Sequence, residues 1–166
     1  MCGLAGIYSH KSVATELYDS LIHLQHRGQD AAGITTYNKH MHKMKGLGLV
    51  RDIFTEKQIK RLKGNIGIAH TRYPTHGGFG HGEIQPCWTS VPYGIALAHN
   101  GNLTNYNELA KNITNNESRY LNTNSDTEVL LHLFAELLHD KNKHDNDERT
   151  NKQTRHQHIS SPYIPT

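Results

Sequence analysis

Residues 1–138 divide into short segments with two hydrophobic patterns, separated by glycines or clusters of polar residues. Short apolar runs and alternating apolar positions are typical of β-strands, and they occur at residues 2–8, 31–37, 64–71 and 93–99. Apolar residues three or four positions apart are typical of amphipathic helices, and they predict helices over about 12–26 and 126–139. Shorter helices are predicted over 53–62 and from Asn105 to about residue 112. The first strand, at residues 2–8, is mostly apolar and is expected to be buried.

Polar residues at the starts of the two longer predicted helices fit the usual capping pattern. Ser12 precedes the first helix and is a candidate N-cap. Ser125 and Glu128 form an S-x-x-E capping box at the start of the second. Both helices are therefore supported by their end signals as well as by their apolar spacing.

The hydrophobic pattern stops near residue 139. From His139 to His158 the chain has no hydrophobic residue. Such a segment cannot bury enough apolar surface to offset the entropy lost on folding. We therefore expect one folded domain over residues 1–139, followed by a polar, disordered tail over residues 140–166.

Composition narrows the classes of function. The length of 166 residues allows at most one domain or part of one, and the formal net charge of +3 is too small and dispersed to favour nucleic-acid binding. No apolar stretch is long enough to span a bilayer, and no secretory signal is visible. The two cysteines, Cys2 and Cys87, allow at most one disulfide. We expect a reduced, cytoplasmic protein that binds neither nucleic acid nor membranes.

Cys2 is the first candidate for chemistry. A methionine before a small residue is normally trimmed, which would leave Cys2 with a thiol and a free α-amine. The two groups titrate at about pH 8.5 and about pH 8, so the amine can accept the thiol proton and later pass it to a leaving group. On the dipeptide alone, Cys2 is more simply the second residue of a strand.

Polar residues follow the predicted strands and start the last helix. Arg72 offers a planar fork for a carboxylate, although an arginine is more often part of a surface ion pair. The Asn100 amide and the Gly101 N–H could bind an oxyanion, although Asn-Gly is also an ordinary turn. Asp126 could bind an ammonium, although an acid in the first turn of a helix is favoured anyway. Each structural alternative is the simpler one when the residue is taken alone.

Taken together with Cys2, these features resemble one family, the class-II (N-terminal nucleophile) glutamine amidotransferases, and within it the glutaminase domain of the amidophosphoribosyltransferases. The similar stretches span residues 1 to about 138 and read MCGLAGIY, LQHRGQDAAGI, KGLGLVRDIF, GNIGIAHTRYPT, IQP, PYGIALAHNGNLTN and NTNSDTEVLL. The resemblance implies an α+β fold, the αββα sandwich of antiparallel sheets of N-terminal nucleophile hydrolases. The sandwich is expected to be incomplete at its C-terminal end, because the resemblance stops near residue 139.

The resemblance also implies catalytic roles. Cys2 would attack the side-chain amide of glutamine, and its own α-amine would act as base and then as acid. The Asn100 side chain and the Gly101 N–H would form the oxyanion hole. Water would release glutamate from the thioester.

Other residues would hold the substrate by the same resemblance. Arg72 would bind the α-carboxylate of glutamine, and Asp126 its α-amino group. Arg27 would order the pocket near the nucleophile. Thr75 and His76 match positions that line the carboxylate side.

The family's whole enzyme transfers the ammonia to phosphoribosyl pyrophosphate in the first committed step of purine biosynthesis. The glutaminase part needs no cofactor, and Mg²⁺ is expected only in a phosphoribosyltransferase domain that this sequence does not contain. That domain is an expected partner, and a homo-oligomer of the full enzyme is possible. Weak or no activity is expected from the chain alone.

Three alternatives remain open. IAHTRYPTHGG partly matches glucosamine-6-phosphate synthase, whose glutaminase domain is the nearest rival. A truncated fragment that binds glutamine without turnover is the second. The third is a metal site at His76, His81 and Cys87, with Glu83 nearby, but its spacing departs from the zinc deaminase signature, and no metal site is expected.

Overall fold

The computed structural model describes residues 1–73, 83–91, 93–116, 120–139 and 141. Thr75, His76, His81 and nearly all of the predicted polar tail lie outside the described residues. In chain order the elements are β1 (Gly3–Tyr8), α1 (Ala14–Leu24), η1 (Gln25–Arg27), β2 (Ala31–Asn38), β3 (His40–Leu47), α2 (Val50–Ile53), α3 (Glu56–Ile59), β4 (Ile66–Arg72), β5 (Cys87–Thr89), β6 (Ile95–Leu97) and α4 (Tyr106–Asn116). A further helix covers residues 126–139. None of the described helices is long and apolar enough to cross a membrane.

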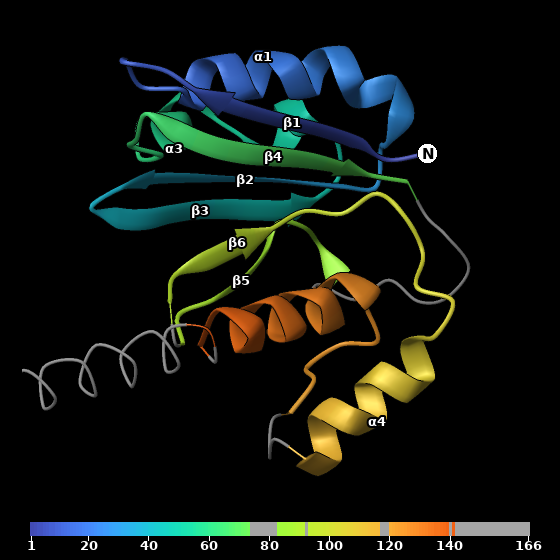
Figure 1. Ribbon diagram of the computed structural model, residues 1–166. Helices are drawn as coiled ribbons and strands as arrows, with labels where there is room; N and C mark the ends of the chain where they lie inside the picture. The colour runs from blue at the N-terminus through green and yellow to red at the C-terminus, as the bar shows by residue number, and fades with distance from the viewer. Residues whose placement is uncertain (74–82, 92, 117–119, 140, 142–166) are drawn as a thin grey trace, which may run out of the picture.

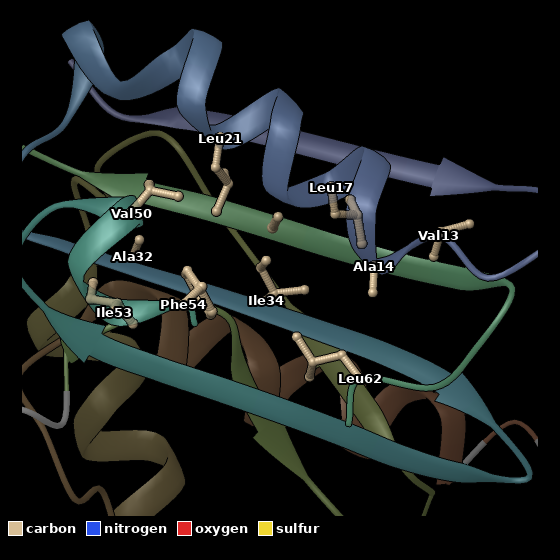
Figure 2. Close-up of a cluster of buried hydrophobic side chains, with 11 residues drawn as sticks. Val13, Ala14, Leu17, Leu21, Ala32, Ile34, Val50, Ile53, Phe54 and Leu62 are labelled. Atoms are coloured by element: carbon tan, nitrogen blue, oxygen red, sulfur yellow. The ribbon is translucent and has the colours of Figure 1, made fainter. Parts of the chain in front are cut away.

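The first sheet has four antiparallel strands in the order β1-β4-β2-β3. One face of this sheet is covered by α1 and the short helices, and the side chains between them form what we call the first core (Figure 2). The first core consists of buried apolar residues: Val13, Ala14, Leu17, Leu21, Ala32, Ile34, Val50, Ile53, Phe54, Leu62 and Ala69. Leu17, Leu21 and Ile34 are completely buried, so α1 and β2 are held together at its centre.

The second sheet pairs β5 with β6 and packs against the helix over residues 126–139. Their contact, the second core, consists of Cys87, Ile95, Leu131 and Ala135. Figure 1 shows the resulting order of layers: α1, the first sheet, the second sheet and the last helix. This confirms the expected α+β architecture, with two antiparallel sheets between layers of helix.

The predicted boundaries of the helices needed two corrections. Ser12 does not cap α1; Val13 occupies the N-cap position, where it is completely buried and its N–H donates to the Gly64 carbonyl at 2.9 Å. The helix expected over 53–62 is shortened to α3, and α2 lies before it and shares only Ile53 with the expected span, because Phe54 is extended between the two helices and is buried beside Tyr18. Tertiary packing thus decides both boundaries.

Two predictions about strands also needed correction. The first strand is not buried, because β1 lies at the edge of the sheet and leaves Leu4 and Tyr8 exposed. The strand β5 was not predicted, because its three residues are too few to show an alternating hydrophobic pattern. The helix that begins at Tyr106 extends to Asn116, beyond the expected end at 112.

Candidate active site

One cleft of about 560 Å³ collects five of the predicted site residues. Its walls include Cys2, Arg72, Asn100, Gly101 and Asp126, which come from four separate segments of the chain. Residues that had not been singled out as site residues complete the lining: Tyr73, Glu83, Gln85, His99, Asn102, Tyr106, Asn124 and Ser125. The cleft therefore lies where the first sheet meets the loops of the second half of the domain.

Cys2 lies just before β1 and is held in place through its own backbone. Its carbonyl oxygen accepts hydrogen bonds from Arg27 Nε and from Asn100 Nδ2, both at 3.2 Å. The next N–H, that of Gly3, donates to Thr71 Oγ1 at 3.2 Å. Gly3 is required here, because a Cβ would lie only 2.6 Å from that oxygen and 2.8 Å from Leu24 Cβ. Arg27 thus contacts the backbone of Cys2 and is not among the residues that line the cleft.

Arg72 ends β4 and reaches the cleft with a mostly buried side chain. The loop after η1 fixes its backbone, since Asp30 N–H donates to the Arg72 carbonyl at 3.2 Å. Gly28 allows this approach, because a Cβ there would lie 2.6 Å from the Arg72 carbonyl carbon. One terminal nitrogen of the Arg72 guanidinium donates to Glu83 in a partly buried ion pair. Arg72 therefore lines the cleft and forms an ion pair, but this pair is mostly buried and is not the surface ion pair considered as the alternative.

Asn100 and Gly101 follow β6 in a loop that is held by side chains. Gln85 bonds both backbone groups of His99, accepting from its N–H at 2.6 Å and donating to its carbonyl at 3.1 Å. Asn100 Oδ1 lies 2.9 Å from Nε2 of the completely buried His70. Asn100 is therefore fixed on both sides, by His70 at one end and by the Cys2 carbonyl at the other.

Asp126 begins the last helix and faces the cleft. Its Oδ2 accepts from the Leu103 N–H at 3.2 Å and lies 3.8 Å from His99 Nδ1. Among the described buried polar atoms, His99 Nδ1 has no hydrogen-bond partner. Asp126 Oδ1 also accepts a hydrogen bond from Thr127 Oγ1 at 3.4 Å. Since a carboxylate has about four lone pairs, acceptor capacity remains for a cationic ligand.

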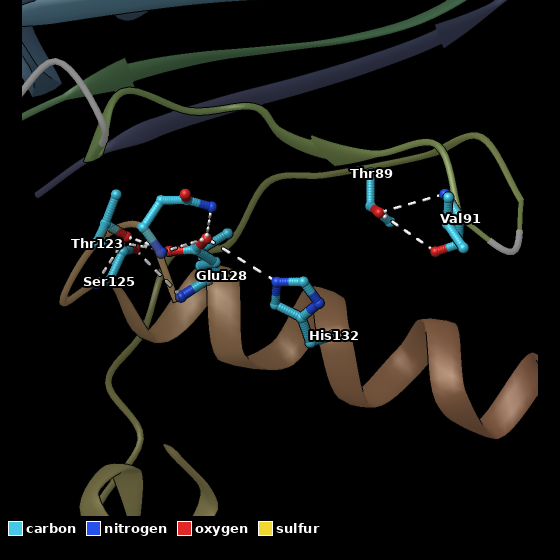
Figure 3. A network of polar contacts seen from close by, with 8 residues as sticks. Thr89, Val91, Thr123, Ser125, Glu128 and His132 are labelled. Carbon is cyan, nitrogen blue, oxygen red and sulfur yellow. Dashed lines mark hydrogen bonds and ion pairs between the residues drawn. The ribbon is translucent and has the colours of Figure 1, made fainter. Parts of the chain in front are cut away.

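Glu128 holds the loop before Asp126 (Figure 3). Its carboxylate accepts four hydrogen bonds, from the backbone N–H groups of Asn122 and Thr123 at 3.0 and 2.8 Å and from their side chains at 2.9 and 2.7 Å. Burial disfavours the charged form, but these bonds outweigh it and hold the pKa of Glu128 below its ordinary value. The predicted capping box is therefore wrong in one half: Ser125 Oγ accepts from Thr127 N–H at 3.3 Å, whereas Glu128 reaches back past Ser125.

Two residues of the alternative metal site, His76 and His81, lie outside the described residues. No group of three His, Cys, Asp or Glu side chains in the described part of the chain could hold a metal ion. Glu83 is paired with Arg72, and burial raises the pKa of the Cys87 thiol to about 11. Cys87 is therefore an inert thiol in the second core, and neither cysteine is in a disulfide.

Sequence reasoning missed the residues that hold the site together, namely His70, Glu83, Gln85, His99 and Glu128. Gln85 lies in the stretch IQP, which was used only as part of the family resemblance, and Glu128 was interpreted as half of a capping box. The His70 contact with Asn100 joins residues 30 positions apart, and no local pattern indicates it.

Comparisons with known proteins agree with this arrangement. Residues 52–144 match the family described as the glutamine amidotransferase domain. The chain is 52% identical over 144 residues to an amidophosphoribosyltransferase of Pseudomonas aeruginosa, covering 86% of this chain and 29% of that protein. It is 50% identical over 140 residues to the enzyme of the same name from Escherichia coli K12, covering 83% of this chain and 28% of that protein. It is 47% identical over 149 residues to the amidophosphoribosyltransferase of the yeast Saccharomyces cerevisiae, covering 87% of this chain and 29% of that protein.

Two solved structures are similar to this fold. One is described as the allosteric regulatory enzyme of purine biosynthesis, with a TM-score of 0.72 and 38% identity over 80% of this chain and 29% of that chain. The other is a glutamine phosphoribosylpyrophosphate amidotransferase from B. subtilis complexed with ADP and GMP, with a TM-score of 0.71 and 36% identity over the same shares. The chain thus spans less than a third of the length of these relatives.

Proposed function

The chain belongs to the glutamine amidotransferase domain family, and we propose that its cleft hydrolyses the side-chain amide of glutamine with Cys2 as nucleophile. The observation that carries this proposal is the convergence of Cys2, Arg72, Asn100 and Asp126 on one cleft. These residues lie far apart in sequence, and together they supply a nucleophile, an oxyanion donor, and one group for each charge of an amino acid.

The reaction starts once Met1 has been removed. Met1 is 83% exposed, which leaves it accessible to an aminopeptidase. The freed α-amine of Cys2 takes the thiol proton, and the sulfur then bonds to the amide carbon of glutamine. The carbon–nitrogen bond breaks as the ammonium group of Cys2 returns a proton to the departing ammonia. Water then cleaves the γ-glutamyl thioester, which releases glutamate and restores the thiol.

Asn100 and Gly101 stabilise the negative charge that develops on the amide oxygen. Asn100 Nδ2 lies 3.2 Å from the Cys2 carbonyl oxygen, so it is adjacent to the nucleophilic residue. Its second hydrogen and the Gly101 N–H are free to donate to the oxyanion. Removing one such donor from an enzyme typically costs about a hundredfold to a thousandfold in rate.

Arg72 and Asp126 hold the two charges of the substrate. Arg72 gives one terminal nitrogen to Glu83, so the α-carboxylate binds the remaining donors of the guanidinium fork. Asp126 keeps lone pairs beyond the bond from Leu103, and these accept the α-ammonium. Arg27 acts behind the nucleophile, through the Cys2 carbonyl. Thr75 and His76 belong to this proposal as further carboxylate-side residues.

In the whole protein, this proposal assigns the ammonia to a phosphoribosyltransferase domain. The relatives are named for that transfer and are more than three times as long as the matched region. The reaction would be the conversion of phosphoribosyl pyrophosphate to phosphoribosylamine in purine biosynthesis, with Mg²⁺ needed only in that second domain. The proposal includes a cytoplasmic location, no cofactor for the glutaminase part, and a homo-oligomer of the full enzyme.

The test is the release of glutamate and ammonia from glutamine by the purified Met1-free chain. Equal yields of both products are expected, at the weak rate expected of the chain alone, with Cys2→Ala abolishing them. Cys87→Ala is the matched control, because it removes the other thiol and leaves the cleft intact. Hydrolysis that persists in Cys2→Ala would overturn the proposal.

A second candidate is a fragment that binds glutamine without turnover. The observation that favours it is the second sheet, which has only two strands in the described residues although it carries the loop of Asn100. Glutamine binding in calorimetry, combined with product release no faster than in Cys2→Ala, would establish this alternative.

A further inference from the structure

His70 is the largest fully buried polar side chain among the described residues, and the proposed mechanism leaves it unused. It is completely buried in β4, between Ala69 and Thr71. Because side chains alternate along a strand and Ala69 belongs to the first core, the His70 side chain points to the opposite face of the sheet. There Nε2 lies 2.9 Å from Asn100 Oδ1.

The hydrogen bonds of Asn100 have a defined direction. The Cys2 carbonyl oxygen can only accept, so the Asn100 nitrogen must be the atom that faces it at 3.2 Å. The Asn100 oxygen then faces His70 and requires a donor. A neutral imidazole has one N–H and one bare nitrogen, so His70 must carry its hydrogen on Nε2.

The other tautomer would reverse this order. With the hydrogen on Nδ1, the bare Nε2 would accept, the Asn100 amide would turn over, and its oxygen would face the Cys2 carbonyl. The amide would then offer no donor to the oxyanion. A single proton position on His70 therefore decides whether Asn100 can act.

We propose that His70 is a positioning residue for the reaction at Cys2: as the neutral Nε2–H tautomer, it fixes the Asn100 amide with its donor facing the nucleophile. The inference rests on the proposed function and deepens it. His70 touches neither substrate nor the reacting atoms and acts through Asn100.

The surroundings of His70 favour this state. Burial lowers its pKa to about 4, and the nearby Arg72 and His99 add to this effect while the bond to Asn100 opposes it. The ring is thus neutral at physiological pH. Nδ1 has no hydrogen-bond partner among the described residues, so a hydrogen placed there would be a buried donor left unsatisfied, which is unfavourable.

The kinetic test compares two replacements with the parent chain. Gln presents an amide N–H near the place of Nε2, whereas Leu fills similar space without a donor. His70→Leu is expected to lower kcat for glutamine hydrolysis by about tenfold to a hundredfold while KM changes by less than about threefold. His70→Gln is expected to recover most of that loss.

A double substitution separates positioning from general damage to the fold. In an Asn100→Ala background, His70→Leu should change kcat by less than about twofold, because the group on which it acts is gone. An equal loss of kcat in both backgrounds, or the same loss in His70→Gln as in His70→Leu, would overturn the inference.

Nitrogen NMR of the imidazoles tests the tautomer without any activity. His70→Gln identifies the signals of His70 among the 14 histidines. At pH 7 we expect the proton of His70 on Nε2 and none on Nδ1. In Asn100→Ala we expect this preference for the Nε2–H tautomer to be lost. A proton on Nδ1 would refute the inference. If the parent chain hydrolyses no glutamine, the proposed function fails, and the NMR result alone then decides the orientation of Asn100.

Discussion

The two halves of the domain are held together by different means. Among the residues that the structure describes, the half formed by α1 and the four-stranded sheet has a core of eleven buried residues, whereas the half formed by β5, β6 and the last helix has a core of four. In the second half, hydrogen bonds from buried polar side chains also hold the loops. Gln85 bonds both backbone groups of His99, and Glu128 accepts four hydrogen bonds.

This difference divides the candidate site. Cys2 and Arg72 come from the well-packed first half, and Asn100, Gly101 and Asp126 come from the second. Cys2 is therefore placed by a sheet with a large core, whereas the proposed oxyanion donors and ammonium site are placed by hydrogen bonds. Variants in the two halves should consequently fail in different ways.

The largest difference is expected in stability. Leu21→Ala removes a completely buried side chain from the first core and should lower the free energy of unfolding by about 2–5 kcal/mol. Leu131→Ala, in the smaller second core, should cost less than half as much, because fewer apolar neighbours surround the cavity. Denaturant unfolding measures both. Equal costs would remove the distinction between the halves.

Next comes the charge of Asp126. Asp126→Asn keeps the shape of the side chain but removes the charge that would bind the α-ammonium, so glutamine affinity should fall by about tenfold to a hundredfold. Calorimetric titration with glutamine measures the change. Asp52→Asn is the matched control, since Asp52 is an exposed acid of the first half and lies outside the cleft. A similar loss in both variants would contradict the assigned role.

Acid should weaken the interface of the two halves through His70. Its pKa is about 4 in the folded chain against an ordinary 6.5, so the unfolded state binds the proton first. The contribution of the neutral ring is complete above about pH 6.5 and is lost as the pH falls from 6.5 towards 4. The melting temperature of the parent should therefore fall more steeply across this window than that of His70→Gln. Parallel curves would contradict the burial of a neutral histidine.

Glu128 should act at lower pH. Its folded pKa is depressed, so its contribution is present above the unfolded value of about 4.3 and is lost as the pH falls through the folded value. Glu128→Gln should cost about 1–2 kcal/mol at pH 7, because an amide replaces a charged acceptor of four hydrogen bonds. The difference from the parent should shrink below about pH 4. A difference that does not change with pH would show that packing, and not charge, is lost.

The smallest effect serves as a baseline. Lys60→Ala removes an exposed ion pair with Glu56 at 2.5 Å on α3. Exposed pairs of this spacing contribute about 0.3–0.5 kcal/mol, so unfolding of this variant should be nearly that of the parent. A cost above about 1 kcal/mol would show that surface charge stabilises the first half more than its core suggests.

Much of the site was readable because its parts carry chemical signals in short stretches. Cys2 at the second position, Asn100-Gly101 after a strand, and Asp126 at a helix start were ambiguous singly and indicated a site only in combination with the family resemblance; the structure brings them to one cleft. The α+β arrangement was implied by the family resemblance, and the strand and helix periodicities were compatible with it. The contacts that hold these residues were not readable, since Arg72 with Glu83 and His70 with Asn100 join separate segments.

Boundaries failed for a similar reason. A serine at position 12 is a good N-cap by itself, but the buried Val13 anchors the chain to Gly64 and delays the helix. Glu128 has the right spacing for a capping box, yet it satisfies the loop at Asn122 and Thr123 instead. In each case, a tertiary contact outweighs a local preference of about 1 kcal/mol.

The most direct test of the central claim is covalent labelling of the Met1-free chain with a diazo-ketone analogue of glutamine, followed by peptide mass spectrometry. The account predicts one adduct, on Cys2, that free glutamine suppresses and that Arg72→Gln and Asp126→Asn strongly reduce. Labelling of Cys87 to the same extent, or labelling of Cys2 that glutamine does not suppress, would contradict it.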